Sequence, residues 1–475
     1  MAGTFGILGT AYSGLAAARA ALEVTGQNVS NANTVGYTRQ RVDQAEVAVA
    51  PAASFRGDQV GQGVKVTGIS RITDEMLNAR VRTTAGTSSY WSTTASAVSS
   101  VEGSLNEPGT TGISSALSDF WADWQGMAND AGSTQTSAAQ AAVLIGQGQL
   151  VANRISAGYT AATNAWSGSR TALSTTVATI NAAAKQVATL NDQINRTQLS
   201  GAGANELIDQ RDTALGTLAT LAGATTRVNT DGTVDVSIGG NAIVSGVTAR
   251  SLRVAGTNDL AAAGTDPVRL EWTDTGRTAA VDGGEVAARL STLAGPAAGG
   301  SGGVYAEAAK VYNDLATSLA SQVNALHQQG STTSGATGLD FFRVGTTGPA
   351  ALSLSVVPTD ATGIAAADPA KGTADGSIAD AISQLGSASG SPDAAWTSFV
   401  SKIGVQSQSA TAQSSLADSA SKAATTAQTS ESGVDLDEET ANLVTFQHAY
   451  QAAARVLTTV DSMLDTIINK MGIGA

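Results

Sequence analysis

The chain has 475 residues, of which 26 are Lys or Arg and 39 are Asp or Glu, so its formal net charge is −13. This negative charge excludes nucleic acid as the main partner, because phosphates would repel it. The lack of cysteine excludes disulfides, thiolate metal sites and a cysteine nucleophile. No apolar run reaches the length of a membrane span, so no membrane insertion is predicted. With only 4% aromatic and 14% charged residues, the chain is expected to build helix pairs and thin layers rather than one thick core.

The N-terminal segment carries a one-sided apolar stripe. Large and small residues alternate there at steps of three and four, which is the spacing of a coiled-coil seam. The seam residues are Leu8, Ala11, Leu15, Ala18, Leu22, Thr25 and Val29. Residues 1–18 contain no Lys or Arg and no sustained hydrophobic block, so a Sec-type signal peptide is not predicted. Export of this protein would then use a route that cleaves no such signal.

The stretch after this helix combines Asn, Gly, Tyr and Arg. By spacing alone it predicts a helix end followed by a loop, because Asn and Gly tolerate left-handed backbone conformations. Its string, Asn31-Ala32-Asn33-Thr34-x-Gly36-Tyr37-x-Arg39-Gln40, closely resembles the signature near the N-terminus of the bacterial flagellar axial proteins, namely the rod, hook and hook-associated proteins. That family usually has Pro at the position of Val35. The Val removes a φ restraint but leaves the turn chemistry intact.

The next part of the chain alternates between extended and helical patterns. Residues 42–72 read as extended segments, and a helix is predicted from Asp74 until Pro108-Gly109 interrupts it. The aromatic cluster at 120–124 has no basic neighbours, so it predicts a core rather than a stacking platform for bases or sugars. A long helix is predicted over 135–195.

A charged helix follows, in which Glu206, Asp209 and Asp212 recur every three residues beside Arg211. Paired carboxylates are able to perform acid–base chemistry, but nothing in the sequence indicates a cleft. A solvated helix face with local ion pairs is therefore predicted. The same segment also resembles one found in hook-associated proteins.

The pattern then changes to alternation with a period of two, on both sides of Asp231-Gly232. Asp-Gly between alternating runs is a strong hairpin signal, so a β-rich insert is predicted over 224–299. Helix returns at 305–329. His327 at its end is interpreted as a residue favoured by the negative end of the helix dipole, and not as a metal ligand.

The segments before the C-terminus are less regular. Leu352, Leu354 and Val356 predict one strand. A helix is predicted over 392–430, with a polar second half that would form an exposed rod, and Ser432-Gly433 is predicted to be a hinge.

The last helix, predicted over 437–471, would be roughly 50 Å long at ~1.5 Å per residue. Asp435 or Asp437 is its expected N-cap, and Lys470 and Gly472 are expected to mark its end. Its seam, with steps of three and four, comprises Leu443, Phe446, Tyr450, Ala453, Leu457, Val460, Leu464, Ile467 and Met471. Such a seam needs a partner, and the N-terminal helix is the expected one, packed antiparallel to it. The segments 432–443 and 447–457 again resemble hook-associated proteins, although the common family form has Asn at Ala453.

The predicted fold is mainly α with a β-rich insert, in several domains. A terminal helical assembly domain comprises 1–40 and 432–475. A long-helix domain comprises 41–223 and 300–431, with an irregular or β segment at 338–390. The β-rich insert at 224–299 forms an outer domain.

The resemblance implies a structural subunit of the bacterial flagellum that joins hook to filament and associates with copies of itself in a ring or tube. Its implied partners are the hook protein, the second hook–filament junction protein, the type III flagellar export apparatus and an export chaperone on the C-terminal helix. Its implied location is extracellular, on the flagellum, after a cytoplasmic stage.

Two alternatives remain open. The chain could be another axial protein, such as hook, rod, the second junction protein or flagellin. It could also be an enzyme or adhesin whose activity lies in the β insert. Two His, no Cys, no phosphate loop and no Ser/His/Asp spacing argue against an enzyme, and no catalytic, cofactor or metal residue is predicted.

Heptad position and resemblance together predict the residues used in assembly. They are Leu8, Leu15, Leu22, Val29, Asn31, Asn33, Gly36, Tyr37, Arg39, Gln40, Leu443, Phe446, Tyr450, Leu457, Val460, Leu464 and Ile467.

Overall fold

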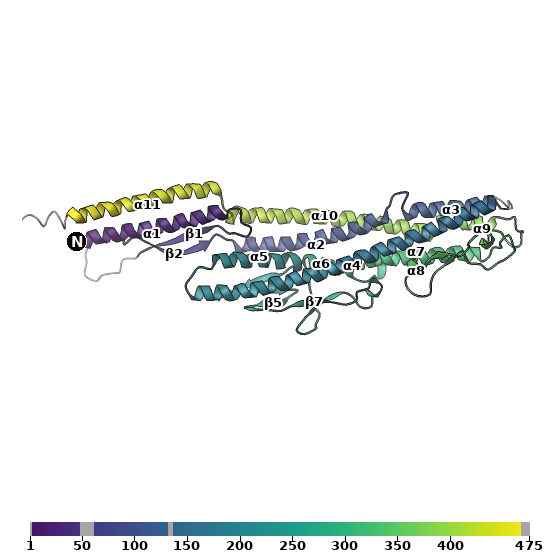
Figure 1. The fold of residues 1–475 in the computed structure, drawn as a ribbon, viewed down its shortest axis with the longest axis horizontal. Helices are drawn as coiled ribbons and strands as arrows, with labels where there is room; N and C mark the ends of the chain where they lie inside the picture. Colours follow the sequence, from purple (N-terminus) through teal and green to yellow (C-terminus); the bar gives the residue numbers. More distant parts are fainter. Residues whose placement is uncertain (1, 48–60, 132–135, 467–475) are drawn as a thin grey trace, which may run out of the picture.

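A computed structural model describes residues 2–47, 61–131 and 136–466. It is an elongated assembly of helices with small antiparallel sheets, as predicted (Figure 1). The helices are α1 Ala2–Asn31, α2 Glu75–Leu105, α3 Ile113–Asn129, α4 Thr136–Leu199, α5 Asn205–Ala222, α6 Gly284–Leu293, α7 Val304–His327, α8 Ala350–Ser353, α9 Ser377–Ser383, α10 Pro392–Ser432 and α11 Leu436–Asp465. The strands are β1 Gln40–Glu46, β2 Val64–Arg71, β3 Thr225–Val228, β4 Val234–Ile238, β5 Asn241–Ser245, β6 Thr248–Ala249, β7 Leu252–Ala255, β8 Arg269–Trp272, β9 Phe342–Arg343 and β10 Ser355–Val356.

The two terminal helices lie side by side, which confirms that each is the other's partner (Figure 1). They are antiparallel, because Asn28 near the end of α1 contacts Glu439 near the start of α11. Asp435 is the N-cap of α11, and its carboxylate accepts the backbone N–H groups of Asp437 and Glu438. The expected stop at 470–472 lies outside the described residues. The strands β1 and β2 pair antiparallel and pack on α1.

A second helix pair, α2 and α10, continues from the terminal pair along the length of the molecule (Figure 1). Asp74 caps α2 through the N–H groups of Met76 and Leu77, which explains why the helix begins there. On α10, small residues recur every seven positions and are buried, as at Ala410, Ala417 and Ala424. Most other residues in the second half of α10 are exposed, as predicted, and the buried part is this stripe of small residues. Alanine has a small apolar side chain, which permits close contact between α10 and α2 along this stripe.

The core lies around α4, whose 64 residues correspond to roughly 96 Å of helix at ~1.5 Å per residue. The aromatic cluster of α3 is buried there, as predicted: Phe120 and Trp124 are 0% exposed. Phe120 packs against Phe341, with ring centroids 5.7 Å apart. Core packing, and not ligand stacking, thus explains these rings.

The β-rich insert is two small antiparallel sheets, one ordered β3-β4-β5-β6 and one made of β7 and β8. The Asp-Gly turn is confirmed: Gly232 adopts φ +80° and β3 pairs with β4 on either side. The sheets are fixed to α4 by buried amides; Asn191 Nδ2 donates to the carbonyl oxygen of Val234 at 2.9 Å. The structure also contains α6 within 224–299, a helix that the sequence pattern did not predict.

The strand predicted from Leu352, Leu354 and Val356 is largely wrong, whereas the predicted place of His327 at a helix end is confirmed. Leu352 lies in the short helix α8, and only Ser355–Val356 form a strand, paired with β9. His327 does end α7, but it is 0% exposed. Its Nδ1 donates to the Leu339 carbonyl oxygen at 2.7 Å, and its Nε2 accepts from the Ala365 N–H at 2.9 Å. Burial lowers the pKa of His327, so a neutral imidazole crosslinks two loops there.

Among the residues that the structure describes, no helix is both long enough and apolar enough to cross a membrane.

Candidate functional site

The signature loop closes onto Asn28, whose side chain is 1% exposed. Asn28 Oδ1 accepts the backbone N–H of Gln40 at 3.0 Å and the Tyr37 hydroxyl at 2.8 Å. Its Nδ2 donates to the Gln40 carbonyl oxygen at 2.9 Å and to Glu439 Oε2 at 3.1 Å. One buried amide thereby joins α1, the start of β1 and α11, with both of its polar atoms paired.

Arg39 ties the same loop to the first turn of α11. Its Nε lies 2.7 Å from Glu439 Oε1, and its Nη1 lies 2.6 Å from Glu438 Oε2. The two carboxylates differ in burial, since the Glu439 side chain is 2% exposed and that of Glu438 is 61% exposed. Burial lowers the pKa of the Arg39 guanidinium, but these carboxylates more than offset it, so the pKa is raised and Arg39 stays charged.

Tyr37 stays neutral in this environment. Burial, together with the carboxylates of Asp209, Glu206 and Glu439, raises its pKa to about 12. A neutral phenol is able to donate its proton to Asn28, which is the contact that the structure shows.

Gly36 lies at the sharpest point of the loop and adopts φ +83°. A Cβ at this position would lie 2.6 Å from Thr213 Oγ1 on α5, so both backbone conformation and space favour glycine. Val35, at the usual Pro position of the family, is 94% exposed and therefore changes no packing.

The acidic face of α5 is not the solvated surface that the sequence predicted. Asp209 is buried, and its Oδ1 lies 2.8 Å from Arg71 Nη2 at the end of β2. Asp212 Oδ2 lies 2.6 Å from the same nitrogen. Burial raises the pKa of Asp209, although Arg71 and Thr38 act against this shift. Glu206 does remain exposed. The prediction failed for Asp209 and Asp212 because their partner is distant in the chain. Arg71 lies 141 positions before Asp212, and it is also the partner of Asp209.

The predicted seam residues are only partly covered. Val460 is buried, and the half-buried ones are Leu8, Leu15, Leu22, Phe446, Leu457 and Leu464. Val29, Leu443 and Tyr450 are exposed, at 39%, 37% and 38%. Ile467 lies outside the described residues. Within the signature, Gln40 is buried, Arg39, Tyr37 and Asn31 are half-buried, and Asn33 and Gly36 are exposed.

Sequence reasoning missed the long-range polar contacts by which four residues join these elements: Asn28, Arg71, Asp209 and Glu439. Asn28 stands only three residues before the signature, and Glu439 was expected only as a first-turn acid. No spacing rule signals either contact, because each joins residues far apart in the chain.

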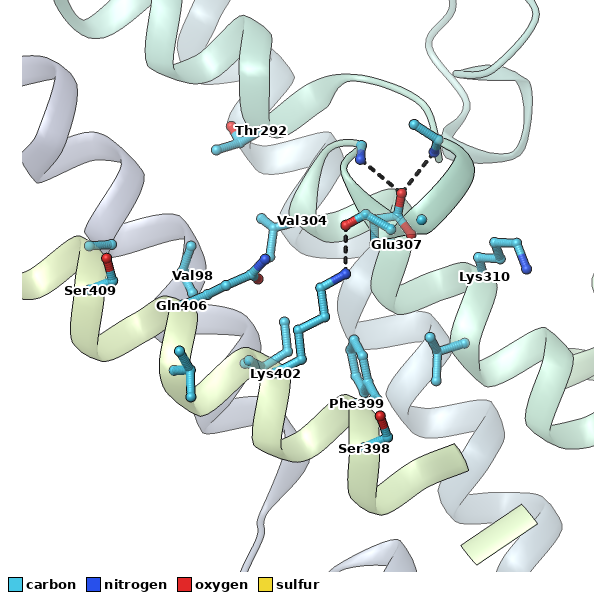
Figure 2. Close-up of a pocket in the computed structure, with 18 of the residues that line it drawn as sticks. Val98, Thr292, Val304, Glu307, Lys310, Ser398, Phe399, Lys402, Gln406 and Ser409 are labelled. Carbon is cyan, nitrogen blue, oxygen red and sulfur yellow. Dashed lines mark hydrogen bonds between the residues drawn. The ribbon is translucent and has the colours of Figure 1, made fainter. Parts of the chain in front are cut away.

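A separate groove of about 740 Å³ lies between α2, α7 and α10 (Figure 2). At its edge Glu307 Oε1 accepts the backbone N–H groups of Ala297 and Gly302, at 2.8 and 2.9 Å. Lys402 Nζ donates to the Gly300 carbonyl oxygen at 2.6 Å. These charged groups hold the loop 297–302 against α7 and α10. No cluster of three or more potential metal-binding side chains occurs within the described ranges.

Three family models match the chain. They are "Flagellar hook-associated protein FlgK helical domain" over 98–342, "Flagella basal body rod protein" over 8–38 and "Flagellar basal body rod FlgEFG protein C-terminal" over 428–470. The last two cover most of α1 and of the signature loop, and all of α11.

Known relatives agree with these models. Flagellar hook-associated protein 1 of Bacillus subtilis is 30% identical over 516 residues, covering 100% of both chains. That of Salmonella typhimurium is 33% identical over 249 residues, covering 52% of this chain and 44% of the relative. The solved structure of the flagellar hook junction protein FlgK from Burkholderia pseudomallei has a similar fold, with a TM-score of 0.60 at 18% identity over 75% of this chain and 100% of that one. The chain thus belongs to the flagellar hook-associated protein 1 (FlgK) family and is a structural protein of the flagellar axis at the hook junction.

Proposed function

We propose that α1 and α11 together form the surface through which this protein assembles with neighbouring copies in a ring or tube between hook and filament. The observation that carries the proposal is the apolar surface that the pair leaves uncovered. On α11, Leu436, Leu443 and Tyr450 are 49%, 37% and 38% exposed. They recur every seven residues, so they lie along one flank of the helix.

A second apolar flank supports the same proposal. Val456 and Met463 of α11, also seven residues apart, are 42% and 54% exposed, and Ile7 and Tyr12 of α1 are 53% and 67% exposed. Large side chains exposed at helical spacing mark an interaction surface when they are contiguous. One partner helix buries only one side of such a seam, so further helices are needed to cover the rest. Contacts that place different surfaces of identical subunits together build rings and tubes rather than closed dimers.

The proposal extends to the partners and location that family membership implies. These are the hook protein on one side, the second hook–filament junction protein on the other, and an extracellular position reached through the type III flagellar export apparatus. A cytoplasmic chaperone on α11 would cover the exposed flank before export. The role is structural and involves no catalysis. We also assign β1 and β2 to the terminal unit, because both strands pack on α1.

The test replaces two exposed apolar residues, as Leu443→Gln with Tyr450→Gln, in a flagellated strain that lacks the chromosomal copy. We expect normal secretion and an unchanged melting curve for the purified chain, with loss of attached filaments in electron micrographs and loss of swimming. The matched control is Val405→Gln with Leu416→Gln on α10, whose side chains are 67% and 66% exposed. Normal filaments in the α11 variant, at wild-type protein levels, would overturn the proposal.

A further inference from the structure

The terminal module, defined as α1, β1, β2 and α11, joins the rest of the molecule through polar contacts. Its own helices and strands pack on one another. Within the described ranges, the main hydrophobic core of the body runs from Ala97 to Ile403 and includes no residue of the terminal module. Apolar packing therefore does not fix how the module sits on the body. We therefore look to hydrogen bonds and ion pairs between polar side chains, which are directional, for the contacts that orient the module on the body.

Those interactions converge on α5, which belongs to the body because Leu215 and Leu218 lie in its core. The guanidinium Nη2 of Arg71, at the end of β2, contacts Asp209 Oδ1 at 2.8 Å and Asp212 Oδ2 at 2.6 Å. The same nitrogen donates to Thr38 Oγ1 at 3.1 Å. Side-chain exposures of 12% for Arg71 and 9% for Asp209 place this contact out of bulk water, where ion pairs are weakly screened.

Two further contacts fix the same joint. Asn205 Nδ2, at the first residue of α5, donates to Gln40 Oε1 at 3.1 Å and to the Ile69 carbonyl oxygen at 3.0 Å. Asp209 Oδ2 also accepts the backbone N–H of Thr38 at 3.3 Å. The hairpin is thus held at both strands. The covalent links to α2 and α10 are the short segments 72–74 and 433–435, and beside the second link the Arg39 N–H donates to the Ser432 carbonyl oxygen of α10 at 3.1 Å. These links limit how far the module lies from the body, and the side-chain contacts on α5 add a directional restraint.

We infer that Arg71, Asp209 and Asp212 form a latch that sets the direction in which the terminal module leaves the body. In this role they are positioning residues for assembly. The inference rests on the proposed function of the terminal module and adds the residues that orient it. A subunit whose module points in the wrong direction cannot place its flank against a neighbour, even though each part is folded.

The experiment measures the direction in the free, full-length chain. Because the natural chain has no cysteine, nitroxide labels at Gln186→Cys on α4 and Gln447→Cys on α11, both exposed, report one distance distribution by pulsed electron resonance. We expect Arg71→Gln to shift or broaden this distribution, with no change in the thermal unfolding of the body. The matched control is Arg196→Gln, which removes an exposed ion pair with Asp192 on α4, with side chains 76% and 41% exposed.

A second variant, Asp209→Asn with Asp212→Asn, removes the latch from the other side and should give the same shift. An unchanged distribution in both latch variants would overturn the inference. The Leu443→Gln and Tyr450→Gln variant should leave the distribution unchanged while it abolishes filament attachment. The direction set by the latch and the assembly surface on α11 are therefore tested by separate measurements, and either is able to fail alone.

Discussion

Glu438 and Glu439 offer a matched pair for asking what holds the two termini together. Both contact Arg39, and the exposed Glu438 makes the slightly shorter ion pair, 2.6 Å against 2.7 Å. Distance alone therefore ranks Glu438 first. Burial ranks Glu439 first, because its side chain is 2% exposed and it also accepts from Asn28. The variants Glu439→Gln and Glu438→Gln separate the two explanations.

The expected magnitudes differ clearly. Breaking a buried ion pair by removing one partner costs about 3–5 kcal/mol, and hydrogen bonds to charged groups contribute about 1.5–3 kcal/mol. Glutamine keeps the shape and one acceptor oxygen, so we expect Glu439→Gln to destabilise the terminal module by about 2–3 kcal/mol. An exposed pair contributes about 0.2–1 kcal/mol, so Glu438→Gln should cost no more than that.

Hydrogen exchange followed by mass spectrometry resolves the effect, because peptides from α1 and α11 report opening of the module separately from the body. At about 1.4 kcal/mol per tenfold change, Glu439→Gln should speed exchange in these peptides roughly 30- to 150-fold. Glu438→Gln should speed it at most about fivefold. Peptides from α3 and α4 should not change in either variant. Equal effects of the two variants, or a larger effect of Glu438→Gln, would refute the argument that burial decides.

Two further predictions concern stability. Gly36→Ala should destabilise the terminal module by about 1–3 kcal/mol in the same exchange assay, because a φ of +83° is strained for alanine and the new Cβ would meet Thr213 Oγ1. The control is Gly103→Ala on α2, where no atom lies within 4 Å of the added Cβ. This variant should be neutral or stabilising. His327 has a lowered pKa when folded, so its contribution to stability is fully present above the ordinary value of 6.5 and falls as pH drops through that value, because the unfolded chain binds the proton first. Thermal melts at pH 7 and pH 5 should therefore differ less for His327→Gln than for the wild type, whereas the exposed His448→Gln should keep the wild-type difference; equal pH dependence in all three chains would contradict a buried neutral His327.

Local signals in the sequence determined most of the helices and turns. The alternation of three and four steps predicted both terminal helices, and the capping side chains of Asp74 and Asp435 lie where the helices begin. Asp231-Gly232 predicted the first hairpin of the insert. These features depend on interactions within a few residues, so a short stretch of sequence is enough to predict them without the tertiary structure. The signature at 31–40 and the pattern of α11 also indicated the flagellar axial family before any fold was known.

Tertiary structure alone decided which polar residues are buried and what they contact. Asp209, on a face that reads as solvated, meets an arginine from β2, and Arg39 reaches a glutamate 400 positions away. His327 ends a helix, as its place in the sequence indicates, but its neutral state comes from burial, and its partners are a carbonyl and an amide in two loops. Burial and long-range pairing depend on how elements approach one another in space, and a periodic pattern records only which face of an element is apolar.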